Sequence, residues 1–297
     1  HRLTGTADLD ISLRNRLRLQ AAYLKWHDPR GSDTPIGTVR RSLEAPEPDK
    51  WHSTRYDGTY SFGAPGARGR IDLHAARLFR RYDNNDQEVR DRDTTELDGT
   101  FYFRVKPKTS LLLELGKRDI DYINQPPEAV SLDSSERRYL LGATWEATAK
   151  TTGTVKFGRI KKIFDAAERE DFSGGGWDVN ITWRPRSYST VDLLTSRKTY
   201  EQTTGVDDFV LVKDIALQWS HKWTQRLDTR LKVSLGRDDY NRSDRQDDRK
   251  AAGIELDYQL RRWLDIGLGY DRTERDSNVN EEDYQSNVFR FSLKAAL

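Results

Sequence analysis

Hydrophobic and polar residues alternate along most of this chain with a period of two. In "WLDIGLGYD" (263–271), Leu264, Ile266, Leu268 and Tyr270 share one parity, while acids and glycines occupy the other. The same alternation recurs in "TADLDISLR", "LDGTFYFRVK", "WDVNITWR", "LDTRLKVSLG" and "VFRFSLKAAL". Because successive side chains of a β-strand point to opposite faces, the pattern predicts about fifteen strands, each with one apolar and one polar face.

The connections between these segments alternate between short and long. Links such as "KPKT", "RPRS" and "TQR" are short, whereas "DNNDQEVRDRD", "INQPPEAVSLDSS" and "ERDSNVNEED" are long and polar. This alternation is typical of an antiparallel meander with two different ends. Outer-membrane barrels have short periplasmic turns and longer extracellular loops. The sequence therefore predicts an all-β, antiparallel up-and-down transmembrane β-barrel.

Composition decides what the two faces contact. The chain is very polar, with 33% charged residues and a mean hydropathy of −0.88, yet its 8 Trp, 13 Tyr and 10 Phe exclude a disordered tail. A barrel of about fifteen strands is too wide for a dry core, so it encloses water or a plug and needs a polar inner face. We therefore expect the apolar rows to contact lipid in the bacterial outer membrane and the polar rows to line a lumen.

Several function classes are excluded or disfavoured. A net charge of +2 gives no general attraction to nucleic acid, and the absence of cysteine excludes disulfides and thiolate sites. The acidic loops "NRSDRQDDR" and "ERDSNVNEEDY" lack the glycine and glutamate spacing of a calcium-binding EF-hand loop. We expect no metal site and no cofactor.

Strand parity nominates the charged residues that face the lumen. Opposite charges on neighbouring strands are expected to form cross-strand pairs that stiffen the wall, and a charged constriction that selects a solute is the alternative. The lumen-lining candidates are Arg14, Arg16, Arg18, Asp72, Asp98, Arg104, Glu114, Arg138, Glu146, Asp178, Asp192, Asp228, Arg230, Lys232, Glu255, Asp257, Asp265 and Arg290.

Aromatic residues gather where the strands meet the turns and loops. Amphipathic rings favour the headgroup level of a membrane, so two aromatic girdles are predicted. The girdle candidates are Trp145, Trp183, Trp219, Trp223 and Trp263 near short turns, and Tyr82, Tyr122, Tyr200, Tyr240 and Tyr270 near long loops.

The parity of the strands also predicts the extent of the barrel. Bacterial barrels have an even strand count with both termini in the periplasm. Residues 1–297 are therefore expected to form a single barrel domain that lacks one or more N-terminal strands of a 16- or 18-stranded protein.

Two stretches carry a family resemblance. "ERRYLLGATWEATAKTTGTVKFGRIKKIFDAAEREDFSGGGWDVNITWRPRSYSTVDLLTSR" (136–197) and "YQLRRWLDIGLGYDRTERDSNV" (258–279) resemble the outer-membrane β-barrel porins of bacterial exopolysaccharide operons. The resemblance implies a barrel that passes a secreted polysaccharide, and it brings no catalytic residues. One departure is the C-terminal residue, which is Leu297 where barrel strands usually end in Phe or Trp for recognition by the assembly machinery.

The leading hypothesis is thus a passive outer-membrane channel for polysaccharide export. Its expected partners are outer-membrane lipids and lipopolysaccharide, the polysaccharide, periplasmic export proteins and the barrel assembly machinery. The alternative is a structural sheath that encloses or docks another protein, such as a cytochrome or a secretion lipoprotein. An enzyme is disfavoured: His74 lies beside Asp72 in the polar row, but no serine is placed as a nucleophile, and no G-x-S-x-G or H-E-x-x-H motif occurs.

Overall fold

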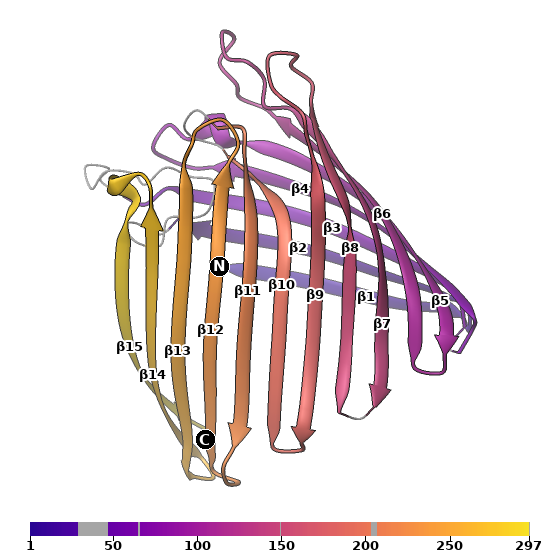
Figure 1. The fold of residues 1–297 in the computed structure, drawn as a ribbon, viewed down its shortest axis with the longest axis vertical. Coiled ribbons are helices and arrows are strands. Elements are labelled where there is room, and N and C mark those ends of the chain that lie inside the picture. The colour runs from indigo at the N-terminus through magenta and orange to yellow at the C-terminus, as the bar shows by residue number, and fades with distance from the viewer. Residues whose placement is uncertain (29–46, 65, 149, 203–206, 297) are drawn as a thin grey trace. The chain divides into compact units, whose positions relative to one another are not determined.

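The structure of the chain is a computed structural model that describes residues 1–28, 47–64, 66–148, 150–202 and 207–296. These residues form fifteen β-strands and two short 3-10 helices (Figure 1). In chain order the elements are β1 (Arg2–Ser12), β2 (Asn15–His27), β3 (Lys50–Phe62), β4 (Gly69–Tyr82), η2 (Glu88–Arg90), β5 (Arg92–Lys106), β6 (Thr109–Tyr122), β7 (Ser134–Thr148), β8 (Thr151–Phe164), β9 (Phe172–Arg186), β10 (Ser189–Glu201), β11 (Phe209–Lys222), β12 (Leu227–Tyr240), β13 (Gln246–Arg261), β14 (Leu264–Ser277), η3 (Asn280–Glu282) and β15 (Tyr284–Ala295).

The sheet order follows the chain order from β1 to β15, and the strands are antiparallel. The pairing of β12 with β13, for example, runs from Leu227↔Tyr258 to Asp239↔Gln246. Short turns such as residues 107–108 alternate with long loops such as residues 123–133. The predicted up-and-down β topology is confirmed. The strands meet the short turns at one end, called the short-turn end, and the long loops at the other, called the long-loop end.

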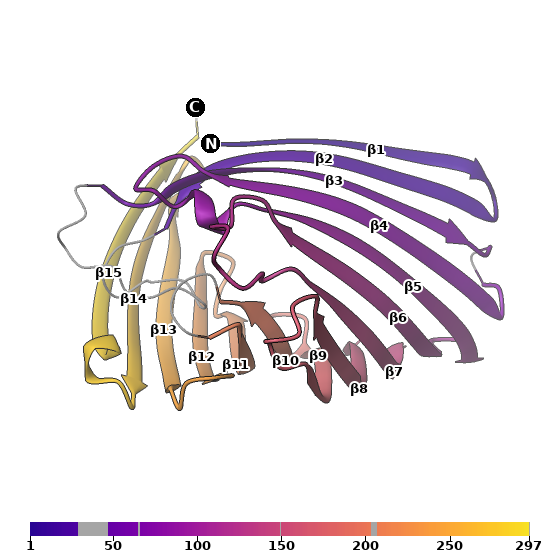
Figure 2. The same cartoon turned by 90° about the horizontal axis from the view of Figure 1, so that it is seen from above.

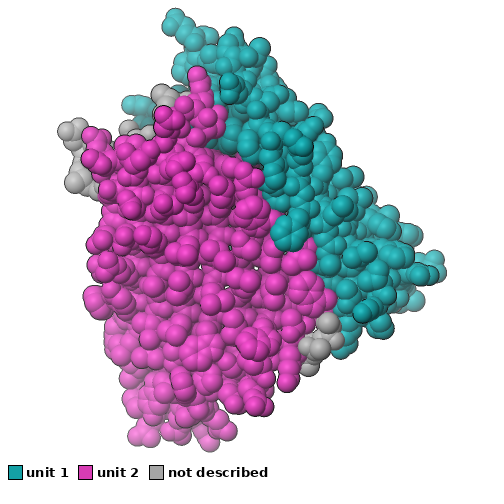
Figure 3. All heavy atoms as spheres, in the orientation of Figure 1, with its two compact units in different colours: residues 1–144, 156–176, 201–209 teal, residues 145–155, 177–200, 210–297 magenta. Residues whose placement is uncertain are grey.

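The contacts within the chain divide it into two compact units (Figure 3). Unit 1 comprises residues 1–144, 156–176 and 201–209, and unit 2 comprises residues 145–155, 177–200 and 210–297. In unit 1 the long strands β1 to β6 run side by side (Figure 2), and in unit 2 the strands β11 to β15 do the same.

One face of each unit is apolar and exposed. On unit 1, Leu73 and Leu115 flank Gly99 in the register of β4, β5 and β6, and they are 51% and 48% exposed. On unit 2, Leu268 lies opposite Phe291, which is 69% exposed. Contiguous apolar surface of this kind is costly in water, because burying it contributes roughly 25 cal/mol per Å². It is the expected surface of a strand that contacts lipid.

The opposite, polar face is not polar throughout. Near the long-loop end of unit 1 it carries Ile120, Leu140 and Ile160, which are all buried. Next to them Phe209 packs against Phe164 and Phe172, with ring centroids 6.4 and 5.2 Å away. A small apolar core therefore forms on the polar face, at a place that strict alternation assigns to the lumen.

Candidate functional site

The polar face of unit 1 carries a network of paired charges across β3 to β7. His74 lies between two carboxylates, with its Nδ1 atom 3.2 Å from Asp98 and its Nε2 atom 3.3 Å from Asp57. Asp98 also accepts a 2.6 Å hydrogen bond from Arg138 on β7. This charge network consists of Arg55, Asp57, His74, Glu96, Asp98, Arg118, Glu136 and Arg138.

A glycine leaves room for the ion pair between Asp98 and Arg138. Asp98 is on β5 and Arg138 is on β7, so their side chains meet above the intervening strand β6. Gly116 faces them from β6, and a Cβ atom added there would collide with the carboxylate of Asp98 and come within 3.1 Å of the Arg138 Nε atom. The missing side chain is what leaves room for an ion pair that spans two strand spacings.

Unit 2 repeats this device on β11 to β13. The Arg249 guanidinium on β13 donates to Asp238 on β12 at 2.7 and 2.8 Å, and to Asp214 on β11 at 2.8 Å. Gly236 on β12 faces the crossing, where an added Cβ atom would lie 2.7 Å from both Arg249 and Asp214. Both units thus join alternate strands on their polar face by an arginine–aspartate pair that passes over a glycine.

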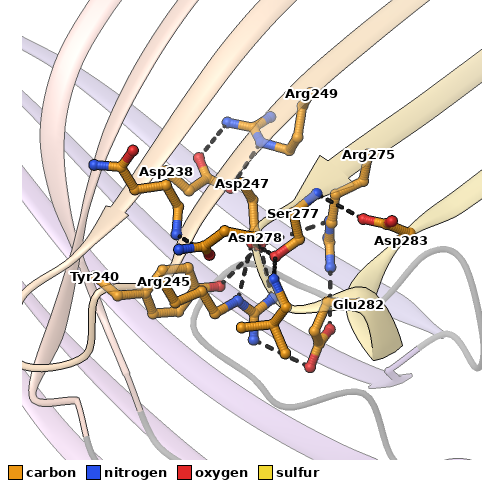
Figure 4. Close-up of polar contacts among 12 residues, drawn as sticks. Asp238, Tyr240, Arg245, Asp247, Arg249, Arg275, Ser277, Asn278, Glu282 and Asp283 are labelled. Atoms are coloured by element: carbon orange, nitrogen blue, oxygen red, sulfur yellow. Dashed lines mark hydrogen bonds and ion pairs between the residues drawn. The ribbon is translucent and has the colours of Figure 1, made fainter.

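The long-loop end of unit 2 carries a buried charged cluster (Figure 4). Arg245 donates to both oxygens of Asp247, at 2.9 and 2.7 Å, and lies 3.1 Å from Glu282 of η3. Ser277 donates to the same carboxylate at 2.6 Å. We call the residues Asp238, Tyr240, Arg245, Asp247, Arg249, Arg275, Ser277 and Glu282 the long-loop cluster.

Burial and pairing oppose each other in this cluster. The Asp247 side chain is fully buried, and Arg245 is 9% exposed. Partial desolvation would by itself lower the pKa of Arg245, but the hydrogen bonds to Asp247 outweigh it and hold that pKa above its usual range. Buried charges of this kind are tolerated because each has a close, well-oriented partner. The cluster ties the β12–β13 loop to the segment that contains η3.

Unit 1 has arginines stacked on aromatic rings at its long-loop end. The guanidinium of Arg80 lies 4.3 Å from the ring centroid of Trp51, and that of Arg90 lies 4.0 Å from the ring of Tyr82. Arg90 is paired with Asp28 and Asp49, at 2.9 and 3.3 Å. Such stacked contacts contribute about 0.5–2 kcal/mol each, more when they are desolvated.

The comparison with protein families decides the identity of the fold. The model of the family described as putative beta-barrel porin 2 matches residues 2–297. The chain belongs to this family. It is an outer-membrane β-barrel, as the alternation of faces predicts.

Solved structures with the same fold include an iron transporter and a ferripyoverdine receptor. The FrpB iron transporter from Neisseria meningitidis matches with TM-scores of 0.62 for the F5-1 variant and 0.60 for the F3-3 variant, at 10% and 11% identity. Each match covers 98% of this chain and 57% of the transporter. The ferripyoverdine receptor of Pseudomonas aeruginosa matches with a TM-score of 0.54 and 9% identity, covering 98% of this chain and 51% of the receptor. The porin chain thus spans about half the length of these structures, and the likeness concerns the fold alone. A search of curated proteins gives no match.

Most of the predicted lumen residues lie on the polar face with a partner close by. Asp98 and Arg138 belong to the charge network, and Arg16 and Arg104 line one small pocket together with Arg68 and Arg70. The other contacts are Arg18 with Asp8, Asp72 with Arg70, Glu114 with Lys156, Asp178 with Lys198, Asp192 with Thr182, Arg230 with Glu255, and Arg290 with Asp271. Their exposure to a lumen stays a prediction.

The remaining lumen candidates are placed by register alone. Asp265 lies opposite Lys294, and Lys232 lies opposite Gly253. Asp228 lies directly opposite Asp257, a like-charged arrangement that is mildly destabilising. Glu146 is exposed.

Arg14 requires a correction. It lies in the turn between β1 and β2, where its carbonyl accepts a hydrogen bond from Gly63, so the parity rule used for it does not apply.

Three of the predicted girdle tyrosines are also corrected. Tyr82, Tyr122 and Tyr240 are only 6–8% exposed, and each lies on the polar face rather than at the membrane surface. Their hydroxyls and rings have protein partners: the Tyr122 hydroxyl donates to Glu201 at 3.2 Å, and Arg245 covers the ring of Tyr240 at 4.4 Å. Each is the last residue of its strand and shares the parity of the polar row, so it turns inward.

The other girdle residues are compatible with a membrane interface. Trp183, Trp223 and Trp263 are 50–56% exposed near the short-turn end of unit 2, Trp145 lies near the β7–β8 turn, and Trp219 lies near the β11–β12 turn. Tyr200 is exposed, and Tyr270 contacts Phe289 on the apolar face. Their contact with headgroups stays a prediction.

Alternation alone could not identify the residues that hold the charged pairs in place. Gly116 and Gly236 are glycines within strands, a signal for close approach of another group. Lys162 is a further residue that the sequence does not predict. It is fully buried and donates to Ser134 at 2.9 Å and to Glu201 at 2.6 Å. A lysine beside an isoleucine in a strand gives no signal of such burial.

The described part of the chain contains neither a metal centre nor a membrane-spanning helix. Among the described residues, no group of three or more His, Asp or Glu side chains is arranged to hold a metal ion. The helices of the described residues are too short or too polar to cross a bilayer.

Proposed function

We propose that this porin is a passive channel that passes a secreted polysaccharide across the outer membrane. The observation that supports this most directly is the charge network of unit 1, which covers five neighbouring strands on the polar face. A wall of this kind is hydrated and polar without carrying a large net charge.

The chemistry of the network suits a large, hydroxyl-rich solute. Carboxylates and guanidiniums offer acceptors and donors in alternation, so sugar hydroxyls can exchange hydrogen bonds with the wall as they pass. Conduction requires binding strong enough for entry and weak enough for release. Near-balanced charges spread over several strands meet that requirement better than one deep site.

The same residues argue for transport rather than catalysis. His74 is the histidine of the polar row, and both of its ring nitrogens face carboxylates. A general base needs a nucleophile within hydrogen-bond reach. We propose that His74 is a structural member of the network, and that direction of transport comes from synthesis of the polymer inside the cell.

The surroundings of the channel follow from its surfaces. The exposed apolar face is proposed to contact the acyl chains of lipids and lipopolysaccharide, and the barrel assembly machinery would insert it there. Periplasmic export proteins would deliver the polymer at the short-turn end.

Channel activity can be tested in planar bilayers and in cells. The purified protein is expected to give single-channel currents with weak ion selectivity, and deletion of its gene to reduce secreted polysaccharide. A protein that is electrically silent, in cells that still secrete normal amounts of polymer, would contradict the proposal. A second protein that co-purifies in the lumen would favour the sheath.

Charge substitutions in the network sharpen the test. Asp98→Arg alone replaces the carboxylate between His74 and Arg138 by a positive charge, so the ion selectivity of the channel should move toward anions. The double variant Asp98→Arg with Arg138→Asp restores the pairing and serves as the matched control. Equal reversal potentials for both variants would place the network outside the conduction path.

A further inference from the structure

A small arginine-rich pocket lies at the short-turn end of unit 1. Its volume is about 140 Å³, and four arginines line it: Arg16 from β2, Arg68 from the β3–β4 turn, Arg70 from β4 and Arg104 from β5. We call it the arginine pocket. It lies on the polar face, because Arg70 and Arg104 share the parity of Asp72 and Asp98.

The positive charge of the arginine pocket is only partly balanced by nearby carboxylates. Arg70 has a carboxylate partner, Asp72, at 3.1 Å. Arg104 donates to the carbonyl of Gly66 at 2.6 Å. Among the described residues, no carboxylate lies within ion-pair distance of Arg16, Arg68 or Arg104. Elsewhere on this face, arginines such as Arg138 have acidic partners.

One donor within the pocket also lacks a partner. The Nε atom of Arg70 is shielded from solvent and has no hydrogen-bond acceptor in the structure. A shielded N–H group without an acceptor is unfavourable, because it has lost its hydrogen bonds to water and gained none in return. The Arg70 guanidinium stacks on the ring of Tyr102 at 4.1 Å, which fixes its position at the pocket wall.

This arrangement matches the chemistry of an oxyanion. Guanidinium groups present planar pairs of N–H donors that fit carboxylate, sulfate and phosphate oxygens, often in a bidentate way. Tyr102 and Ser110 add a ring wall and a hydroxyl to the lining. An anion in the pocket would neutralise three mutually repelling cations.

We propose that the arginine pocket binds an oxyanionic substituent, such as a carboxylate, of a saccharide that enters the barrel at its short-turn end. The inference rests on the proposed channel function, because it names the class of solute that the channel receives. It assigns an acidic polysaccharide rather than a neutral one. The balanced charge network then passes the polymer onward without holding it.

Direct binding tests the pocket without requiring conduction. Folded protein in detergent is titrated calorimetrically at low ionic strength with inorganic phosphate, with oligogalacturonate and with a neutral oligosaccharide such as maltotriose. We expect phosphate and oligogalacturonate to bind and to compete with each other, with affinities that fall as salt is added. Maltotriose is expected neither to give a binding heat of its own nor to displace the two anions.

Paired variants show whether the pocket is responsible. Arg16→Gln with Arg104→Gln is expected to weaken oligogalacturonate binding at least tenfold. Arg14→Gln with Lys108→Gln removes the same charge from exposed positions at the short-turn end but outside the pocket, and should leave the affinity within about twofold. Heat-modifiable migration in electrophoresis confirms that each variant is folded.

Three results would overturn the proposal. They are the absence of oligogalacturonate binding, an equal loss of affinity in both double variants, and binding of phosphate that the oligosaccharide cannot displace. The last result would identify a site for free phosphate instead. A protein that binds the oligosaccharide but gives no channel currents would reject the proposed channel and keep the pocket, whereas a conducting protein without binding would do the reverse.

Discussion

Arginine has different roles in the long-loop cluster of unit 2 and in the arginine pocket of unit 1. In the long-loop cluster, Arg245 and Arg249 are held by carboxylates on neighbouring strands and loops. In the arginine pocket, Arg16, Arg68 and Arg104 surround a cavity without carboxylate partners among the described residues. A paired, buried guanidinium fixes the chain, and an unpaired one beside a cavity is available to a solute.

The difference has an energetic basis. Removing one partner of a buried ion pair leaves an uncompensated charge in a poorly solvated place, and this typically costs about 3–5 kcal/mol. Removing a charge from a group of like charges relieves repulsion instead. Stability measurements on the two regions should therefore differ clearly, with a large loss in the long-loop cluster and little change in the arginine pocket, whatever the channel carries.

The largest effect is expected for Asp247→Ala in the long-loop cluster. The substitution leaves Arg245 and Arg275 buried without this carboxylate, and it removes the acceptor of the Ser277 hydroxyl. We expect a loss of about 3–5 kcal/mol in the free energy of unfolding, measured by urea titration in lipid vesicles. Trypsin should also cleave the β12–β13 loop faster.

Asp248→Ala is the matched control for this variant. Asp248 is the next residue of β13 and is exposed. Its removal should change the unfolding free energy by no more than about 0.5 kcal/mol. Equal losses in the two variants would show that the long-loop cluster does not stabilise the barrel.

The next largest effect tests the assignment of the two faces, on which the comparison depends. Val233 is 52% exposed on the apolar face of β12, and Ser234 follows it on the polar face. Val233→Arg should destabilise the protein in bilayers by about 2–4 kcal/mol, as a charge on the lipid face does near the midplane. Ser234→Arg should have a much smaller effect in the same unfolding titration. If the two positions respond in reverse order, the lipid and lumen faces have been exchanged.

Strand topology was the part of the fold that sequence could predict. Period-two alternation and loop lengths depend on local geometry, so segments such as 263–271 reveal strand, face and hairpin order without knowledge of their neighbours. Even cross-strand pairs such as Arg18 with Asp8 follow from parity and hairpin register.

The girdle errors arose because a position beside a long loop does not show which face an aromatic side chain occupies. Tyr82, Tyr122 and Tyr240 resemble girdle residues in the sequence, but each turns inward against charged partners. The sequence predicts only part of the arginine pocket. Parity assigns Arg16 and Arg104 to the polar face, whereas Arg68 lies in a turn, where parity does not apply. Its grouping depends on three hairpins, and one strand's alternation contains no information about that.

A smaller effect is expected from the glycines that the charged pairs cross. Gly116→Ala would displace Asp98 or Arg138, and Gly236→Ala would displace Arg249. Overpacking of this kind costs about 1–3 kcal/mol, although alanine otherwise suits a strand better than glycine by about 0.5–1 kcal/mol. Gly99→Ala is the control, because its nearest neighbour would be Leu73 at an ordinary 3.6 Å. Urea midpoints should fall for both test variants and stay unchanged or rise for the control; a rise in all three would show that the pairs move aside freely.

The smallest effect on stability is expected in the arginine pocket, and it is the one that separates the two regions most clearly. Arg68→Gln removes a cation that has no carboxylate partner among the described residues but lies over the Phe103 ring, 5.4 Å from its centroid. The free energy of unfolding should change by less than about 1 kcal/mol, because relief of repulsion offsets the loss of this contact. Added phosphate should stabilise the wild-type protein more than this variant, because a ligand that binds only the folded state raises stability more when it binds more tightly. If Arg68→Gln instead lowers stability as much as Asp247→Ala does, then Arg68 has a structural role like that of Arg245, and the distinction between paired and available guanidiniums fails.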